Sequence, residues 1–278
     1  ISLSDTEKST GPPAGIQRSA HERGTLRAYE KEERLIVIVI GMHRSGTSAV
    51  AGILHLNGIA MGSEKTFKPK PLPQNPKGFY ENYDFRKIND QILKQAGYKV
   101  KSFDTDIPVI HASDRTVTKM GKLTEKQVFE NTDWGWKDPR TCLTLSEWLT
   151  LFEEKGLLED TKVVFTTRSA SAVAESLRKR NELHIDNGLM LWRLYHERAL
   201  EALEQFPVPR FHFSYENLLN DSHLVCGRLF QFLGKSFDAS MVGRFIDPDL
   251  NRSELSAKVK LGGELTALSE KLHSLSSV

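Results

Sequence analysis

The sequence predicts an α/β fold with a central parallel sheet flanked by helices, on three observations. A continuously apolar, β-branched run at 35–41, LIVIVIG, is typical of a parallel strand covered on both faces. A glycine-containing turn and an apolar helical pattern follow this run directly. Strand and helix patterns then alternate along the chain, which is the order that builds a parallel sheet from βαβ units.

The elements follow in order from this first strand. The turn GMHRSGTS at 41–48 leads into a helix that ends near Asn57 and Gly58. Prolines and lysines crowd 62–78 and predict an extended surface segment there. Later strands are predicted within 134–140, 162–168 and 210–214. Later helices are predicted around 84–96, 124–130, 141–155, 170–180, 187–205 and 222–232.

The length of 278 residues suits a single folded domain, which we assign to 34–245. Residues 1–33 show neither a helical nor a strand period, so we expect a flexible N-terminal arm. Residues 246–278 are polar and weakly patterned, and we expect a C-terminal tail of uncertain order.

Composition excludes several classes of partner. The 38 Lys and Arg residues nearly balance 36 Asp and Glu residues, so no global field gathers nucleic acid or an anionic membrane. Cys142 and Cys226 fall in predicted helices, and we expect buried free thiols. The run at 35–41 is far shorter than the roughly 20 residues of a membrane-spanning helix. These features predict a cytoplasmic protein without a membrane span, and they leave open an anchor or domain upstream of Ile1.

The turn at 41–48 has the GxxxxG spacing of a nucleotide phosphate loop and lies between a buried strand and a helix. Backbone amides at such a helix start converge on an anion. Thr47 replaces the lysine of ATP-binding loops, and we find no apolar run that ends in an aspartate suited to magnesium. The loop therefore favours phosphate binding over kinase chemistry, with an ordinary Gly-Ser turn as the alternative. The predicted phosphate-binding residues are Arg44, Ser45, Gly46, Thr47 and Ser48.

The RSGTS core at 44–48 resembles the 5'-phosphosulfate loop of sulfotransferases that use 3'-phosphoadenosine 5'-phosphosulfate (PAPS). Its arginine is more similar to the carbohydrate and tyrosylprotein enzymes than to the small-phenol enzymes. The likeness spans about 35–235 and implies a P-loop-containing sulfotransferase-like fold. It also implies PAPS as co-substrate, adenosine 3',5'-bisphosphate as product and no metal, because fixed cations and amides can stabilise the charge of sulfuryl transfer.

A second family feature is an arginine at a strand end with a serine eight residues later, which bind the 3'-phosphate. Arg168 and Ser176 match this interval, and the resemblance implies that Tyr215 in FSYENLLND contacts the adenine. The alternatives are an exposed cation, a surface serine and a core tyrosine. The Arg-Lys-Gly element that closes the nucleotide site in many members is absent, and Lys258 and Lys260 are weak substitutes.

An attacking hydroxyl must lose its proton, so a positioned base is expected. The likeness to carbohydrate and protein sulfotransferases implies Glu81 in KGFYENYDF, although a carboxylate favoured by a helix N-terminus is the alternative. Competing candidates are His43, His55 and Asp84. His43 lies inside the phosphate loop and alternatively contacts the sulfuryl group, while His55 falls on a helix face typical of a core histidine.

The cluster WGWKDPR at 134–140 resembles a stretch of bacterial sulfotransferase-like sequences. The resemblance suggests that Lys137 stabilises charge on the bridging oxygen and that Arg140 lies near the phosphosulfate or the acceptor. A solvated, salt-bridged turn is the alternative. His184 and Trp192 are predicted to border the acceptor cleft, and the four tryptophans are candidate sugar-stacking surfaces.

These inferences predict a sulfotransferase that moves the sulfuryl group of PAPS to an acceptor hydroxyl by in-line attack, assisted by a carboxylate base. The arginine-type loop and Glu81 favour a carbohydrate or glycan acceptor by family analogy, with a small molecule as the wider class. Two alternatives stay open: a P-loop nucleotide kinase or NTPase, and a non-catalytic nucleotide-binding protein with this fold.

Overall fold

The computed structural model describes residues 34–72, 75, 77–246 and 261–278. The predicted arm at 1–33 and the candidates Lys258 and Lys260 lie outside the described residues. A four-stranded parallel sheet with the strand order β2-β1-β3-β4 forms the centre of the described part. The strands are β1 (Leu35–Ile40), β2 (Asp133–Lys137), β3 (Thr161–Thr167) and β4 (Arg210–Ser214).

Strand β1 lies inside the sheet because both of its faces are apolar. All six of its residues are buried, and Ile38 pairs with Trp136 of β2 on one side and Val163 of β3 on the other. Because helices cover both faces of this strand, no position along it faces water, and the sequence LIVIVI is therefore continuously apolar instead of alternating with polar residues. The predicted α/β class with a parallel sheet is confirmed.

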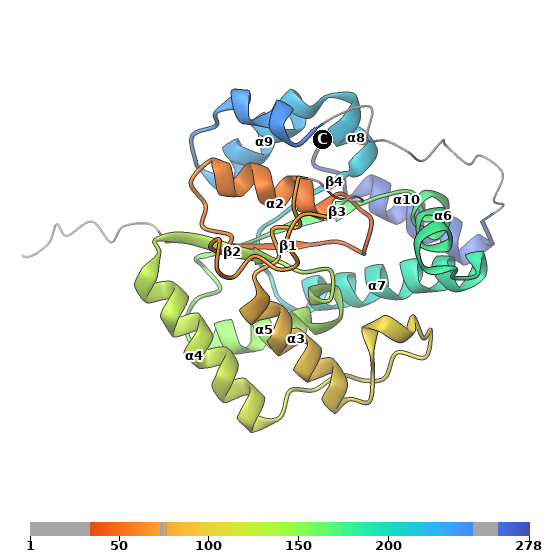
Figure 1. The fold of residues 1–278 in the computed structure, drawn as a ribbon, viewed down its shortest axis with the longest axis horizontal. Coiled ribbons are helices and arrows are strands. Elements are labelled where there is room, and N and C mark those ends of the chain that lie inside the picture. Colours follow the sequence, from red (N-terminus) through yellow and green to blue (C-terminus); the bar gives the residue numbers. More distant parts are fainter. Residues whose placement is uncertain (1–33, 73–74, 76, 247–260) are drawn as a thin grey trace, which may run out of the picture. The chain divides into compact units, whose positions relative to one another are not determined.

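Helices cover both faces of the sheet (Figure 1). Helices α2, α8 and α9 lie on one face, and α3, α4, α5 and α7 lie on the other. The helices are α2 (Thr47–Leu56), α3 (Tyr83–Gln95), α4 (Asp114–Glu130), α5 (Thr141–Glu154), α6 (Ala170–Asn181), α7 (Ile185–Gln205), α8 (Tyr215–Asn220), α9 (Ser222–Leu233) and α10 (Gly263–Ser274). Two short 3₁₀ helices are η1 (Val100–Ser102) and η2 (Ala239–Arg244).

Each face of the sheet has its own apolar core. The core under α2 and α9 takes Val37 and Val39 of β1, while the opposite core takes Ile36, Ile38 and Ile40, as the two-residue period of a strand requires. The opposite core also holds all four tryptophans, which are at most 2% exposed: Trp134, Trp136, Trp148 and Trp192. Their expected role as sugar-stacking surfaces is therefore wrong, because these rings stabilise the fold from inside.

Two helical segments differ from the sequence prediction. Helix α4 begins ten residues before the predicted start at 124, and α10 was not predicted. Only Leu268 and Leu272 of α10 are buried, and two apolar residues make too narrow a stripe to predict a helix. Beyond α10 the chain returns to the sheet, where the Ser277 amide donates to the His212 carbonyl of β4 over 2.7 Å.

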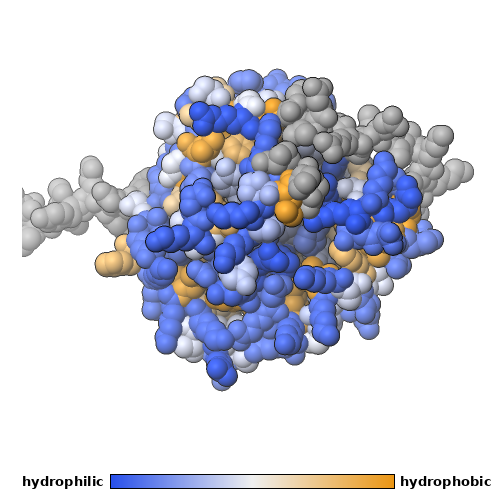
Figure 2. Space-filling view, viewed as in Figure 1, coloured by the Kyte–Doolittle hydropathy of each residue, from blue (hydrophilic) through white to orange (hydrophobic). Residues whose placement is uncertain are grey.

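The surface in view is largely hydrophilic with isolated apolar residues (Figure 2). Among the described residues, Val109 and Phe129 are the most exposed large apolar side chains. No helix in the described ranges combines the length and apolarity that a bilayer span needs. Cys142 and Cys226 are buried free thiols in α5 and α9, as predicted.

Candidate functional site

The candidate site lies at the carboxyl ends of β1 and β3, which are neighbours in the sheet. The chain leaves β1 toward β2 on one side and later enters β3 on the other, so the strand order changes direction at β1. Connections that diverge in this way open a crevice beyond the carboxyl ends of the strands. The loop that follows β1 and Arg168 after β3 both lie at this edge of the sheet.

Two glycines give the loop at 41–48 its shape. Gly41 has φ +150°, and a Cβ there would lie 2.3 Å from the Thr166 carbonyl oxygen of β3. Gly46 caps α2 in the left-handed region with φ +81°, and a Cβ there would lie 2.2 Å from the ring of Tyr215. No side chain caps the first turn of α2, so its amides remain available to an anion, which the helix dipole also favours.

Two hydroxyl residues of the loop are buried, Ser45 at 0% and Thr47 at 4% exposed. The Ser45 Oγ makes no hydrogen bond within the described part of the chain. A buried hydroxyl without a partner is costly, and the oxygens of a bound phosphate would satisfy it. The loop therefore fits a phosphate ligand in both its backbone and its side chains.

Arg44 links the loop to the second predicted anion-binding turn. Its Nε donates to the Ser176 Oγ of α6 over 2.9 Å, and the Arg168 guanidinium donates to the Arg44 carbonyl oxygen over 2.9 Å. Burial, then the charges of Arg180 and Arg168, lower the pKa of Arg44. The two turns are thus in direct contact, and their cations repel one another unless an anion lies between them.

Tyr215 covers this junction from the start of α8. Its ring packs against Gly46, and the guanidinium carbon of Arg168 lies 4.9 Å from the ring centroid, within range of a cation–π contact. Tyr215 is half-buried, so one part of its ring faces the loop while the remainder stays open to solvent. The structure brings Tyr215 to the predicted phosphate-binding residues.

Trp192 and His184, the two residues predicted to border the acceptor cleft, differ in burial. Trp192 is buried, and its indole Nε1 donates to the Arg168 carbonyl oxygen over 2.9 Å, so it supports the end of β3 from within the core. His184 is exposed at the N-terminus of α7, where its Nδ1 accepts from the Asp186 amide. The Trp192 ring is therefore enclosed in the core, whereas the His184 ring is open to solvent.

Lys137 and Glu81 form a buried ion pair next to the loop. The Lys137 Nζ lies 3.0 Å from the Glu81 Oε1 and donates to the Ser48 Oγ of α2 over 3.2 Å. Lys137 is 1% exposed, and a lysine ammonium is tolerated at such burial only when paired. This ammonium group comes from the end of β2, outside the loop at 41–48.

Local backbone pairing places Glu81. Its carbonyl oxygen accepts from the Lys68 amide over 3.1 Å, and the next residue, Asn82, caps α3 by accepting from the Asp84 amide. Arg86, one turn into α3, approaches the second Glu81 oxygen at 3.7 Å. The competing candidate Asp84 instead forms an ion pair with Lys87, so it does not join the cluster.

Arg140 is held by carboxylates. Its guanidinium donates to Asp138 over 2.8 Å and to Asp90 over 2.7 Å. Burial works against the Arg140 charge, but Asp138 and Asp90 raise its pKa above the ordinary range. Burial likewise opposes ionisation of Asp138, yet Arg140 and Asn89 hold the pKa of this carboxyl below its ordinary value. These contacts match the alternative of a salt-bridged turn, although a buried one.

Sequence reasoning missed three residues of α3 around this turn, Arg86, Asn89 and Asp90. The i, i+4 spacing of Arg86 and Asp90 was a visible signal of an ion pair on one helix face. Asn89 carried no signal, because a buried asparagine cannot be told from an exposed one in a single sequence. Its amide donates to Asp138 and Thr141.

His43 lies within the loop with its ring at the edge of the Tyr195 ring, 5.8 Å between centroids. Burial and the positive charge of Arg140 lower the pKa of His43 to about 3, so the ring is neutral near pH 7. Its buried Nε2 has no partner within the described residues. His55 packs against Phe67 in the core under α2, as its helical position predicted.

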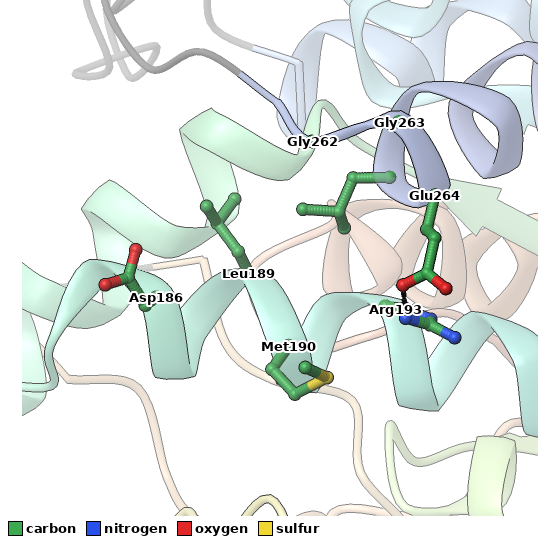
Figure 3. A pocket seen from close by; sticks show the side chains of 8 residues that line it. Asp186, Leu189, Met190, Arg193, Gly262, Gly263 and Glu264 are labelled. Atoms are coloured by element: carbon green, nitrogen blue, oxygen red, sulfur yellow. Dashed lines mark hydrogen bonds and ion pairs between the residues drawn. The ribbon is translucent and has the colours of Figure 1, made fainter.

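A separate pocket lies between α7 and the start of α10 (Figure 3). Arg193 and Glu264 form an ion pair along one of its sides. Its lining residues are Asp186, Leu189, Met190, Arg193, Gly262, Gly263, Glu264 and Leu265. This lining shares no residue with the loop at 41–48, so the pocket is distinct from the candidate site. In the described ranges, no group of three or more His, Cys, Asp or Glu side chains gathers as metal ligands do.

The solved structures that are similar to the chain include two sulfotransferase domains. The sulfotransferase domain from the curacin biosynthetic pathway is 17% identical, with a TM-score of 0.51 over 86% of this chain and 98% of that domain. The sulfotransferase domain from the Synechococcus PCC 7002 olefin synthase is also 17% identical, with a TM-score of 0.54 over 88% of this chain and 97% of that domain. At this identity the likeness shows the shared fold.

The sequence itself matches a family model described as the sulfotransferase family over residues 37–239. No curated protein matches the chain. The matched range contains the phosphate loop, Glu81, Lys137, Arg168 and Ser176. Because the match covers well over half of the sequence and the fold agrees with it, the chain belongs to the sulfotransferase family.

Proposed function

We propose that this protein transfers the sulfuryl group of PAPS to a hydroxyl group of a carbohydrate, with Glu81 as the base. The observation that carries the proposal is that the two predicted anion-binding turns meet at Arg44, whose Nε donates to Ser176 and whose carbonyl oxygen accepts from Arg168. One nucleotide with phosphates at both its 3' and 5' positions would bridge these turns. PAPS has this arrangement, whereas ATP carries its phosphates in one chain.

The 5' end of the nucleotide would bind the loop, where the first amides of α2, the Ser45 hydroxyl and Arg44 converge. Arg44 uses its Nε for Ser176, and within the described residues its two Nη groups make no hydrogen bond and remain for the ligand. The 3'-phosphate would bind Arg168 and Ser176. Tyr215 would contact the adenine from its position over Gly46.

When bound, PAPS supplies a sulfuryl group with a good leaving group attached. Lys137 reaches the loop at Ser48, so its charge is available where negative charge develops on the leaving oxygen. Glu81 would accept the proton of the acceptor hydroxyl at its carboxylate. The pairing of Lys137 with Glu81 holds both groups at fixed positions beside the loop, which lowers the cost of orienting them.

The carbohydrate acceptor rests on the similarity of the arginine-type loop and Glu81 to carbohydrate sulfotransferases. Because the tryptophans are buried, other side chains near Glu81 would have to recognise the sugar. Fixed cations around the loop replace a metal in this scheme. We therefore expect sulfuryl transfer to persist in the presence of a chelator such as EDTA.

Calorimetry with adenosine 3',5'-bisphosphate tests the nucleotide site. The wild-type protein should bind it, and Arg168→Ala should weaken binding by at least about tenfold, because a charge-assisted hydrogen bond contributes roughly 1.5–3 kcal/mol. Arg178→Ala is the matched control, since this arginine lies on the same helix as Ser176 but pairs with Glu175. No binding by the wild type, or equal binding by Arg168→Ala, contradicts the proposal.

Transfer assays with labelled PAPS and a panel of sugars test the chemistry. Glu81→Gln should lower the rate by about 10²–10⁴-fold, the usual contribution of a general base, while bisphosphate affinity stays within about twofold. Magnesium-dependent ATP hydrolysis in place of sulfuryl transfer would favour an NTPase. Bisphosphate binding without transfer to any hydroxyl would favour a non-catalytic nucleotide-binding protein.

A further inference from the structure

Tyr80, which directly precedes Glu81, has a backbone conformation that tyrosine rarely adopts. Its φ is +50°, in the left-handed region. We propose that Tyr80 is a positioning residue, whose ring holds the backbone in this conformation and so directs the Glu81 carboxylate toward Lys137 and the acceptor hydroxyl. The inference rests on the proposed role of Glu81 as the base. It adds a residue that acts through Glu81 and has no contact of its own with the reacting atoms.

The left-handed backbone of Tyr80 is unusual for a residue with a Cβ. In this region the Cβ crowds the following carbonyl oxygen, so such residues persist only where their surroundings hold them. Only four described residues other than glycine have a positive φ, and two of them belong to the candidate site: Arg44 in the phosphate loop and Tyr80 beside Glu81. Strained backbone of this kind gathers at functional sites, which makes Tyr80 a candidate for a role in the function of Glu81.

The Tyr80 ring lies in an aromatic cluster drawn from three other segments. Its centroid is 5.0 Å from that of Phe67, 5.7 Å from that of His55 in α2 and 5.3 Å from that of Phe245, which follows η2. Gly52 of α2 makes room for this cluster, because a Cβ there would lie 2.1 Å from the Phe245 ring. Aromatic rings at these separations attract one another beyond their apolar contact, so the cluster holds Tyr80 in a conformation that its backbone disfavours.

Hydrogen bonds fix the backbone on the other side of this residue. The Glu81 carbonyl oxygen accepts from the Lys68 amide over 3.1 Å, and the Tyr83 amide donates to the Thr66 carbonyl oxygen over 2.8 Å. The chain from Glu81 onward is therefore held by this pairing, while Tyr80 is held by its ring. The conformation at Tyr80 joins the two fixed parts and decides the direction in which the chain enters Glu81.

The two adjacent side chains reach different parts of the molecule. The Tyr80 ring packs on the apolar core under α2, whereas the Glu81 Oε1 lies 3.0 Å from the Lys137 Nζ at the end of β2. An ordinary extended or helical backbone at Tyr80 would turn one of these side chains away from its present contacts. Loss of the ring should therefore move the carboxylate, and a base must lie within hydrogen-bond reach of the proton that it accepts.

Steady-state kinetics with labelled PAPS test the role of Tyr80. The acceptor is the best substrate among the 4-nitrophenyl glycosides of glucose, galactose and N-acetylglucosamine. Tyr80→Ala should lower kcat by about 10- to 100-fold, the effect of misplacing a catalytic group by about 1 Å, while KM for PAPS and bisphosphate affinity stay within about twofold. Tyr80→Phe keeps the ring and its packing, so it should retain kcat within about twofold.

A second background separates positioning from general support of the fold. In Glu81→Gln the carboxylate is absent, so adding Tyr80→Ala should lower the remaining rate by less than about threefold. Damage to the fold or to the phosphate loop would instead lower the rate by the same factor in both backgrounds. Non-additive effects on kcat are therefore the signature of a residue that acts through Glu81.

A crystal structure of Tyr80→Ala gives a readout that does not depend on turnover. The Glu81 Oε1 should lie beyond hydrogen-bond distance of the Lys137 Nζ, in place of the present 3.0 Å. Phe237→Ala is the matched control, because it removes a half-buried ring that packs on Phe230 in the same core but is not adjacent to Glu81. This control should lower the thermal midpoint without changing kcat. If Tyr80→Ala does not fold, Tyr80→Leu, which keeps apolar bulk, takes its place with the same expected direction.

Several outcomes overturn the inference. Tyr80→Ala retains the wild-type kcat or the Glu81–Lys137 contact, it lowers kcat equally in both backgrounds, or Tyr80→Phe is as impaired as Tyr80→Ala. The last outcome would assign the effect to the Tyr80 hydroxyl instead of its ring. Failure of the proposed function has a different signature, because the wild type would then sulfate none of the glycosides or Glu81→Gln would match the wild-type rate, and the inference would fall with it.

Discussion

Lys137 is the most deeply buried cation of the site, and its charge can be buried because Glu81 pairs with it. The pair lies 3.0 Å apart with the lysine 1% exposed. Removing one partner of such a pair leaves an uncompensated charge in a low-dielectric environment, whereas removing both does not. The two side chains are therefore coupled in stability as well as in the proposed chemistry.

A double-mutant cycle measures this coupling. Lys137→Met should lower the free energy of unfolding by about 3 kcal/mol, because Glu81 then keeps a buried charge without its partner. Adding Glu81→Met should recover much of that loss. Urea unfolding of the wild type, both single variants and the double variant gives the coupling energy, and strictly additive effects would show that the two charges are screened from each other.

Gly46 is required by two separate features of the phosphate loop. Gly46→Ala should lower the free energy of unfolding by at least about 1–2 kcal/mol, because φ is +81° and the new Cβ would meet the Tyr215 ring at 2.2 Å. It should also weaken bisphosphate binding. Gly46→Ala combined with Tyr215→Ala relieves the ring contact alone, so it should recover only part of the stability. Wild-type stability of Gly46→Ala would contradict this reading of the loop.

At the scale of elements, α3 connects the base candidate to the turn after β2. Its N-terminus follows Glu81, and its buried Asn89 bonds four partners on the turn and on α5. The Asn89 amide donates to Asp138 and Thr141, while its oxygen accepts from Thr144 and Trp148. All of its bonding capacity is used, which fixes α3 against the strand end that carries Lys137.

Replacing Asn89 tests this connection. Asn89→Leu should lower the free energy of unfolding by about 3 kcal/mol, because buried polar groups on Asp138, Thr141 and Trp148 lose partners. Lys94→Leu, at an exposed position of the same helix, should change stability by less than about 0.5 kcal/mol. Thermal unfolding compares the two variants, and equal midpoints would mean that the Asn89 contacts add nothing to stability.

At the scale of the whole molecule, buried histidines couple stability to pH. His196 and His212 lie in the core next to Phe165, and burial lowers the pKa of each to about 4. Their ordinary value is about 6.5, so between pH 6.5 and 4 the unfolded chain binds protons that the folded chain does not. Stability is therefore greatest above pH 6.5 and falls as the pH drops through this window.

Each of these histidines should cost about 1.4 kcal/mol per pH unit within the window. His196→Asn keeps a donor for the Trp192 carbonyl oxygen but cannot be protonated. Unfolding should therefore take up about one proton fewer, so the free energy of unfolding should depend less steeply on pH, by about 1.4 kcal/mol per pH unit. Urea unfolding at several values from pH 7 to pH 5 measures the slope. The exposed His223→Asn is the control, and an equal change in both variants would contradict the prediction.

Local patterns predicted most of the elements. The strands β1, β3 and β4 and the helices α5, α6 and α9 lie within one or two residues of their predicted ranges, because their apolar periods match what they bury. The glycine turn at 41–48 was predicted between a strand and a helix because glycine positions and the strand-to-helix context are both local. Helix α10 and the first half of α4 were missed, since their few buried residues leave little periodic signal.

Only part of the candidate site could be predicted from such local patterns. Lys137 and Glu81 were both selected, but their ion pair joins segments 56 residues apart and could not be derived from either segment. Arg140 was selected for a ligand, whereas Asp138 and Asp90 hold its guanidinium. Which carboxylate reaches which cation depends on how α3 packs against β2, and no local pattern encodes that packing.

The sequence by itself determined the α/β class, most of the strands and helices, the glycine turn at 41–48 and membership of the sulfotransferase family, because these depend on residues close together in the chain. Tertiary structure decided that Arg44 meets Ser176 and Arg168 and that the tryptophans are buried. The physical reason is that burial and charge pairing are properties of packed neighbours, and neighbours in space come mostly from distant parts of the chain.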